Sequence, residues 1–137
     1  MFETIDHVGI AVADIDDAIA VYTRLTGAGP AHRELVERDG IEAVMFTVGA
    51  SRIELLAATR EDCAISGFLA KHGGGLHHVA YGVANVQSAL DTYAGAGMRL
   101  LDHCPRVGAG GRMVAFLHPS AAVGVLTELC MPAGPTQ

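Results

Sequence analysis

Apolar and polar residues follow the same order twice along the chain. Residues 5–12 alternate and end at Asp14, which predicts a strand that leads into a helix N-cap. Apolar residues then recur at helical spacing up to Leu25, and Gly27 is expected to end that helix. A weaker pattern predicts a strand at 31–38. Strands are also predicted at 42–48 and 51–57, joined as a hairpin with Gly49 and Ala50 near the turn.

The second half repeats this order. A strand is predicted at 77–84 and a helix from Asn85 to about Ala94, ended by Gly95 and Gly97. Further strands are predicted at 98–102, 112–118 and 123–130. A short helix is expected within 59–72, before three consecutive glycines, and residues 132–137 are expected to be a frayed tail.

The amino acids themselves repeat at a constant shift of 71 residues: HVGIAVADI from His7 aligns without a gap with HVAYGVANV from His78. Neither half can bury both faces of its sheet alone. We therefore expect one α+β domain, 1–137, of two tandem βαβββ modules that form a curved, barrel-like mixed sheet around a metal-binding cleft. The expected boundaries are about 4–58 for module one, about 59–75 for a linker helix and about 76–131 for module two.

The repeat duplicates candidate metal ligands. His7 and His78 occupy equivalent positions, and each is followed, 47 or 50 residues later, by a glutamate inside an apolar strand, Glu54 or Glu128. A carboxylate within a buried strand is costly unless it is paired or binds a metal. Two imidazoles and two carboxylates suit cobalt, manganese, nickel, iron or zinc, with coordination positions left open. The alternative is that both glutamates face solvent on edge strands.

Composition excludes several classes of function. The chain has 137 residues, a formal net charge of -6 and a single lysine, Lys71. This charge argues against a nucleic-acid surface, which needs clustered basic residues. The three cysteines have no metal-type spacing and imply no disulfide framework. The N-terminus resembles no signal peptide, and no apolar run is long enough to span a bilayer. We expect a cytoplasmic protein with no membrane partner.

Several segments resemble the vicinal oxygen chelate superfamily, which includes glyoxalase I and extradiol dioxygenases, and within it the methylmalonyl-CoA epimerase family. The resemblance covers nearly the whole chain, and the late segments are its more specific part. The segments that carry it are DHVGIAV from Asp6, IELL from Ile53, FLAK from Phe68, LHH from Leu76, GAGG from Gly108, FLHP from Phe116 and GVLTEL from Gly124.

The resemblance implies a metal-dependent epimerase that acts at C2 of methylmalonyl-CoA by removing and returning a proton through a metal-stabilised enolate. Its metal ligands fall on His7, Glu54, His78 and Glu128, and the metal is expected to be cobalt. The resemblance also implies an acyl-CoA substrate and a homodimer. Epimerisation is simplest with two acid/base groups, one for each face of the substrate.

Glu128 is the candidate for one acid/base group. Some family members carry the other as a glutamate close to the segment from Gly40 to Ala43. Other members lack this glutamate, so its absence would not exclude epimerase activity. Counted without gaps between Gly40 and Glu54, that position falls on Ala43. Glu42 is one residue away, and a shift of one residue along a strand turns a side chain to the opposite face of the sheet. Glu42 is therefore a candidate catalytic residue, with a solvated strand residue as the alternative.

The glycine-rich segment from Arg106 to Arg112 is a candidate substrate-binding loop, because backbone amides in such loops bind carboxylates and phosphates. The alternative is a hairpin turn. The candidate contacts for coenzyme A or the substrate carboxylate are Lys71, Arg106, Gly110, Gly111 and Arg112.

Three other functions stay open. The chain could be another enzyme of the superfamily, of glyoxalase or dioxygenase type. It could epimerise a related acyl-CoA such as ethylmalonyl-CoA. It could also be a non-catalytic protein that binds a ligand in the same cleft.

Overall fold

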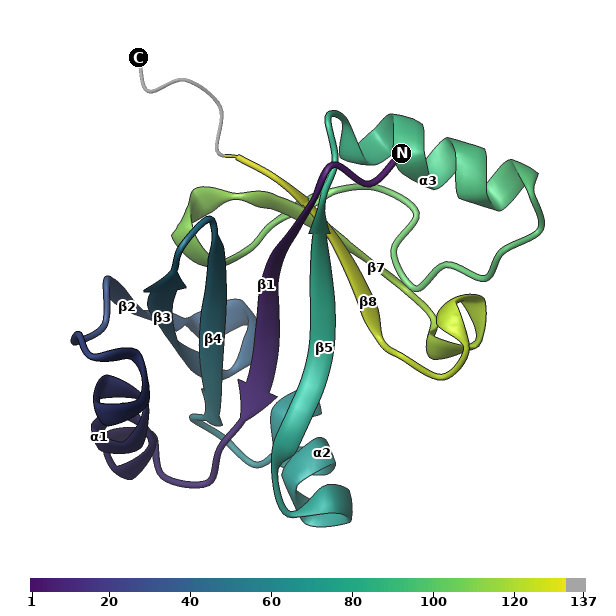
Figure 1. Cartoon of the computed structure of the whole chain (residues 1–137). Coiled ribbons are helices and arrows are strands. Elements are labelled where there is room, and N and C mark those ends of the chain that lie inside the picture. Colours follow the sequence, from purple (N-terminus) through teal and green to yellow (C-terminus); the bar gives the residue numbers. More distant parts are fainter. Residues whose placement is uncertain (133–137) are drawn as a thin grey trace. The chain divides into compact units, whose positions relative to one another are not determined.

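A computed structural model of the chain describes residues 1–132 (Figure 1). Two compact units are distinguished: the first unit is His7–His77, and the second unit joins Met1–Asp6 to the residues from His78 onward. The elements are β1 (Thr4–Ala11), α1 (Ile15–Thr26), β2 (His32–Val36), β3 (Ile41–Val48), β4 (Ser51–Ala58), α2 (Ala64–His72), β5 (Gly75–Gly82), α3 (Val86–Gly95), β6 (Arg106–Val107), β7 (Met113–Leu117) and β8 (Thr127–Met131).

The predicted α+β fold of two βαβββ modules is confirmed. The first module orders its strands β2-β3-β4-β1, and the second orders them β5-β8-β7-β6. In each module the first and last strands pair parallel, β1 with β4 and β5 with β8, whereas the other neighbours pair antiparallel. The last strand of each module therefore lies beside its first strand, which carries the repeated histidine.

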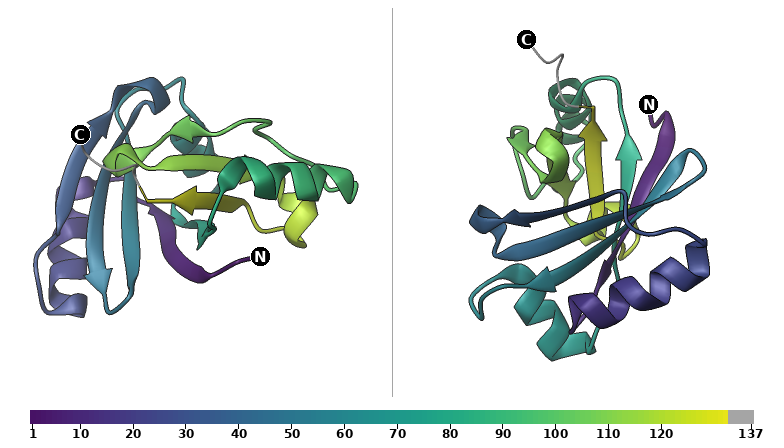
Figure 2. Two further views of the ribbon diagram at one scale, coloured as in Figure 1. Left: turned by 90° about the horizontal axis from the view of Figure 1, so that it is seen from above. Right: turned by 90° about the vertical axis from the view of Figure 1, so that its left-hand side faces the viewer.

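Helix α1 of the first unit forms where the pattern predicts it. Asp14 caps α1, because its side chain accepts a hydrogen bond from the Asp17 amide at 2.9 Å. Gly27 ends the helix in the left-handed region at φ 81°. The right-hand view of Figure 2 shows α1 lying across one face of β3 and β4.

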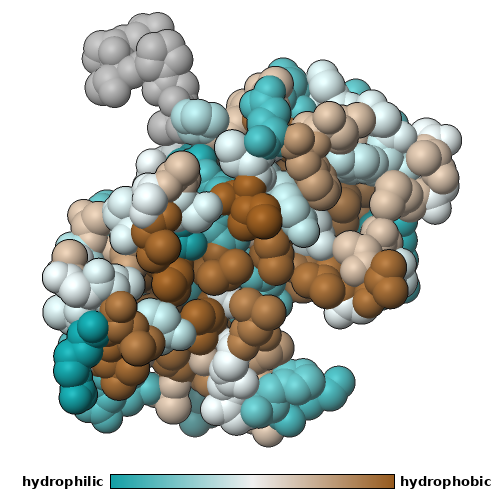
Figure 3. Space-filling model, in the orientation of Figure 1, coloured by the Kyte–Doolittle hydropathy of each residue, from teal (hydrophilic) through white to brown (hydrophobic). Residues whose placement is uncertain are grey.

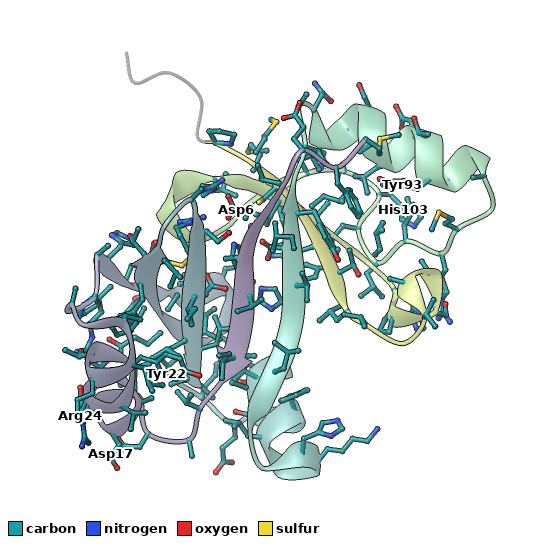
Figure 4. All side chains as sticks on the ribbon, in the orientation of Figure 1. Asp6, Asp17, Tyr22, Arg24, Tyr93 and His103 are labelled. Atoms are coloured by element: carbon teal, nitrogen blue, oxygen red, sulfur yellow. The ribbon has the colours of Figure 1, made fainter. Side chains whose placement is uncertain are left out.

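The core of the first unit lies between α1 and these strands. Figure 4 shows Tyr22 on the strand-facing side of α1, whereas Asp17 and Arg24 point outward. Buried Val44, Phe46 and Leu55 pack there against partly buried residues of β1, α1 and the connection between them, namely Ile10, Val12, Ile15, Ala18, Ile19 and Tyr22. At the lower left of Figure 3, where α1 lies in Figure 1, hydrophilic residues form the outer edge beside apolar ones.

The second unit is built in the same way. Asn85, which is 71 residues after Asp14, caps α3 by accepting from the Ser88 amide at 2.8 Å. The left-hand view of Figure 2 shows α3 alongside β7 and β8. Their shared core contains Val83, Val86, Ala89, Leu90, Ala115, Leu117 and Leu129. Phe2, from the start of the chain, stacks on Tyr81 at 4.0 Å between ring centroids.

Two of the predicted strands were wrong in part. The segment 98–102 forms no strand, and only Leu100 makes an isolated bridge to Leu117. The predicted strand 123–130 begins at Thr127 instead, because Pro119–Ala122 form a 3-10 turn and Val123 follows in the left-handed region at φ 56°. Most of the predicted frayed tail, residues 133–137, lies outside the described residues.

Among the described residues, no helix is long and apolar enough to cross a membrane. The single-domain organisation, with module boundaries at about 58 and 76, stays a prediction.

Candidate functional site

His7 and Glu54 form a buried pair within the first unit. They lie on adjacent parallel strands, where Gly9 of β1 is the register partner of Glu54 of β4. His7 is 4% exposed and Glu54 is 5% exposed. His7 Nε2 lies 3.5 Å from Glu54 Oε1. Since Ile53 and Leu55 pack on the α1 side, period-two alternation puts Glu54 on the opposite face.

His78 and Glu128 form the equivalent pair within the second unit. Ala80 of β5 is the register partner of Glu128 of β8, and this repeats the arrangement of the first pair. His78 is 2% exposed and Glu128 is 6% exposed, with 3.7 Å between His78 Nε2 and Glu128 Oε1. Leu129 packs on the α3 side, so the prediction that each glutamate faces away from its apolar neighbours is confirmed in both modules.

The donors in each pair suit a bound divalent ion. Hydrogen bonds between nitrogen and oxygen are usually about 2.7–3.2 Å long, and both separations exceed that range. Two ligands bonded at about 2.1 Å to one ion, with angles of about 90–109°, lie about 3.0–3.4 Å apart. The observed separations are near that value. Each module therefore offers one imidazole nitrogen and one carboxylate oxygen in a dry environment, and these donors fit a metal.

A cation and an aromatic ring accompany the pair in the second unit. The Phe116 ring meets the His78 imidazole edge to face, 5.6 Å between centroids. The Arg106 guanidinium lies over the same Phe116 ring at 5.5 Å, and its Nε is 3.6 Å from a carboxylate oxygen of Asp102. Because Phe116 is the register partner of Glu128, Arg106 lies on the face that carries the His78–Glu128 pair.

Arg112 has a different role from the one expected of a substrate contact. Its Nη2 donates to Asp6 Oδ1 at 2.7 Å, and both side chains are largely buried. Burial raises the pKa of the neighbouring Cys130 thiol to about 12, helped by the negative charges of Asp6 and Glu128 and opposed by Arg112. Arg112 is thus an internal ion-pair partner of Asp6. The face of each module that carries its histidine–glutamate pair is called the ligand face, and Arg106 lies on that face in the second unit.

The glycine-rich segment is a hairpin connection between β6 and β7. The Gly108 amide donates to the Arg112 carbonyl at 2.8 Å, and Gly110 and Gly111 both have φ 71°. Such left-handed positions favour glycine. Lys71 lies in the last turn of α2, in the first unit, and its side chain is exposed.

The match to known families covers most of the chain. Residues 6–116 match the model of the glyoxalase/bleomycin resistance protein/dioxygenase superfamily. The ethylmalonyl-CoA/methylmalonyl-CoA epimerase of Cereibacter sphaeroides is 37% identical, over 94% of this chain and 98% of its own length. The Streptomyces coelicolor methylmalonyl-CoA epimerase, solved as a variant with 2-nitronate-propionyl-CoA, is 38% identical with a TM-score of 0.93, over 100% of this chain and 99% of that one.

A further solved structure, a methylmalonyl-CoA epimerase in complex with methylmalonyl-CoA and ammonium, is also 38% identical. Its TM-score is 0.93, over 98% of this chain and 97% of that one.

The chain belongs to the methylmalonyl-CoA epimerase family.

Glu42 does not share a face with Glu54 in this member of the epimerase family. Register pairs Glu42 with Ala57, whereas Glu54 pairs with Met45, so Glu42 and Glu54 lie on opposite faces. The Glu42 carboxylate binds Arg33 Nε, and Arg33 also pairs with Asp16 of α1 at 3.2 Å. These contacts hold the Glu42 side chain on the α1 side. The hypothesis that Glu42 is catalytic is therefore not supported.

Two further residues, to which the sequence analysis assigns no role, lie on the face that carries Glu54 in this member of the epimerase family. His32 and Glu34 of β2 are two residues apart, and Glu34 is the register partner of Ala43. His32 Nε2 lies 2.8 Å from Glu34 Oε1. The available signal was their spacing, since residues two apart in a strand share a face. It was missed because the 31–38 segment alternated only weakly.

Proposed function

We propose that this chain is a divalent-metal-dependent epimerase that interconverts the two epimers of methylmalonyl-CoA at C2. One observation carries the proposal: each module buries one histidine and one glutamate at equivalent ladder positions, in a chain of this epimerase family. Buried charges of this kind are retained where they are paired or bind a metal.

The proposed ligands are His7, Glu54, His78 and Glu128, two from each module. Cobalt is the proposed ion, and other divalent metals that accept nitrogen and oxygen donors are alternatives. When bound, such an ion supplies a Lewis acid for the substrate thioester carbonyl and a fixed point for the substrate. The proposed homodimer and cytoplasmic location stay predictions.

The reaction needs little beyond proton transfer. The C2 hydrogen lies between a thioester carbonyl and a carboxylate, so its removal leaves an enolate. A carboxylate that takes this proton on one face, and a carboxyl group that returns one on the other, invert the centre. We assign one of these two roles to Glu128, whose carboxylate lies beside the proposed ligand His78.

The rest of the substrate is anionic, and this chain offers few cations. We propose that Arg106, held over Phe116 on the ligand face, binds the substrate carboxylate. Exposed Lys71 and the backbone amides at Gly110 and Gly111 are the proposed contacts for the coenzyme A moiety. Arg112 is not included, because Asp6 already pairs with it.

The test uses metal-loaded full-length protein in deuterated water. Each epimer of methylmalonyl-CoA should acquire deuterium at C2 and convert into the other. Recovery of unlabelled starting epimer with cobalt, manganese, nickel, iron and zinc in turn would exclude the proposed function. Tight substrate binding without exchange would instead support a non-catalytic binding protein.

A second substrate has a specific observation in its favour. The Cereibacter sphaeroides relative is named for both ethylmalonyl-CoA and methylmalonyl-CoA. Comparing kcat/KM for the two thioesters therefore decides the preferred acyl group. Activity on a glyoxalase hemithioacetal or on a catechol with oxygen, without C2 exchange, would favour the other superfamily chemistries.

A further inference from the structure

The family position for a second acid/base glutamate falls on Ala43 in this chain, and a methyl group cannot transfer a proton. Period-two alternation places Ala43 and Met45 of β3 on the same face as Glu54 of β4, since Met45 is the register partner of Glu54. A carboxylate of the first unit that replaces this glutamate therefore has to come from another position on that face.

The strand register identifies one such carboxylate. Along β1 to β4 the face of Glu54 includes one other acidic residue within the strands, and that residue is Glu34 of β2, opposite Ala43. Directly opposite residues in an antiparallel pair have Cβ atoms about 4.5–5.5 Å apart. The small Ala43 side chain leaves room for a glutamate on the neighbouring strand to lean across it toward Glu54.

The dimensions suit a substrate held between Glu34 and the proposed metal ligand Glu54. Glu34 and Glu54 are two strands apart and offset by two residues, which gives about 12 Å between their Cα atoms from ideal sheet spacings. Two glutamate side chains that lean toward each other shorten this gap to the size of a small acyl group. Glu34 is also positioned, since His32 Nε2 lies 2.8 Å from Glu34 Oε1.

The same place in the second unit is occupied by a charged side chain. Arg106 of β6 is the register partner of Val114, and Glu34 of β2 is the register partner of Ala43. Val114 is the repeat equivalent of Ala43, since it lies 71 residues later in the chain. In both modules the outermost strand thus carries a charged residue on the ligand face, acidic in the first and basic in the second.

We propose that Glu34 is the second acid/base group of the epimerase, held by His32, and that it takes the place of the glutamate absent at Ala43. This rests on the proposed function. For one epimer, the Glu34 carboxylate accepts the C2 proton, and the electron pair of the C–H bond passes into the thioester enolate. The carboxyl group of Glu128 returns a proton to the other face of C2. The opposite epimer reacts in the reverse order.

The experiment compares Glu34→Gln with wild type, starting from each epimer separately in deuterated water. Glu42→Gln is the matched control, because it removes the same charge from the opposite face of the neighbouring strand. In Glu34→Gln we expect epimerisation to fall at least about 100-fold, the usual contribution of a general acid or base. One epimer should still exchange its C2 hydrogen at close to the wild-type rate, and bound metal and melting temperature should be unchanged.

Glu42→Gln should epimerise within about threefold of wild type. Epimerisation by Glu34→Gln at a rate this close to that of wild type would overturn the proposal. Loss of C2 exchange from both epimers, while the metal stays bound, would overturn it as well. Failure of the proposed function itself is a different result, since wild type would then exchange neither epimer. Recovery of epimerisation in Glu34→Ala on adding formate would support the proposal independently.

Discussion

Arg112 donates a hydrogen bond to Asp6 across 2.7 Å and so joins the residue before β7 to the residue that directly precedes His7. The Arg112 side chain is 19% exposed and the Asp6 side chain 14%. A charge so largely buried is costly once its partner is removed. The pair is therefore expected to stabilise the second unit, which contains both residues.

Replacing this arginine should destabilise the protein. For Arg112→Met we expect the free energy of unfolding to fall by about 1.5–3 kcal/mol, the range for a hydrogen bond to a charged group. Urea denaturation measures it. Arg24→Met, on the outer side of α1, is the control and should change stability by less than about 1 kcal/mol. Unchanged stability with a raised KM would instead restore Arg112 as a substrate contact.

Metal binding should depend on the buried histidines. His7→Ala and His78→Ala should each lose the bound divalent ion in elemental analysis. Wild type should gain about 2.7 kcal/mol of stability at a free metal concentration 100 times its Kd, and the variants should gain almost none. His103→Ala, an exposed histidine of the second unit (Figure 4), is the matched control. Full metal content in His78→Ala would refute the ligand assignment.

The thiol of Cys63 should react at lower pH than an ordinary cysteine. Burial alone would raise its pKa, but hydrogen bonds with the Ser66 hydroxyl and amide outweigh burial, and the pKa is lowered. Because the thiolate is the reactive form, a lower pKa moves alkylation to lower pH. Iodoacetamide labelling, followed by mass spectrometry of the Cys63 peptide, gives the midpoint. Ser66→Ala should move that midpoint upward, and an unchanged midpoint would contradict the account.

The two equivalent helix caps should contribute alike. Asp14→Ala and Asn85→Ala each remove a side-chain acceptor from the amide three residues later, at a cost of about 1 kcal/mol. Thermal or urea unfolding of the two single variants measures this cost. A negligible loss in both variants would show that packing alone holds α1 and α3.

Much of the fold was predictable because the sequence repeats where the structure does. Asp14 and Asn85 marked both helix starts, and alternation around Glu54 and Glu128 correctly set the face of each glutamate. The strand near 98–102 was not predictable, since its apolar residues resemble a strand although only Leu100 makes a bridge. The faces on which Glu34 and Glu42 lie depend on how β2 pairs with β3, and the weak alternation of residues 31–38 does not fix that register.

The central claim is that this chain inverts C2 of an acyl-CoA at a metal held by the two buried histidine–glutamate pairs. Its most direct test is nuclear magnetic resonance of (2R)-methylmalonyl-CoA mixed with cobalt-loaded protein in deuterated water. The account predicts deuterium at C2 in a mixture of both epimers, with no reaction in the metal-stripped protein and recovery after reloading. Unlabelled (2R) substrate from the loaded protein, or full activity in the stripped protein, would contradict it.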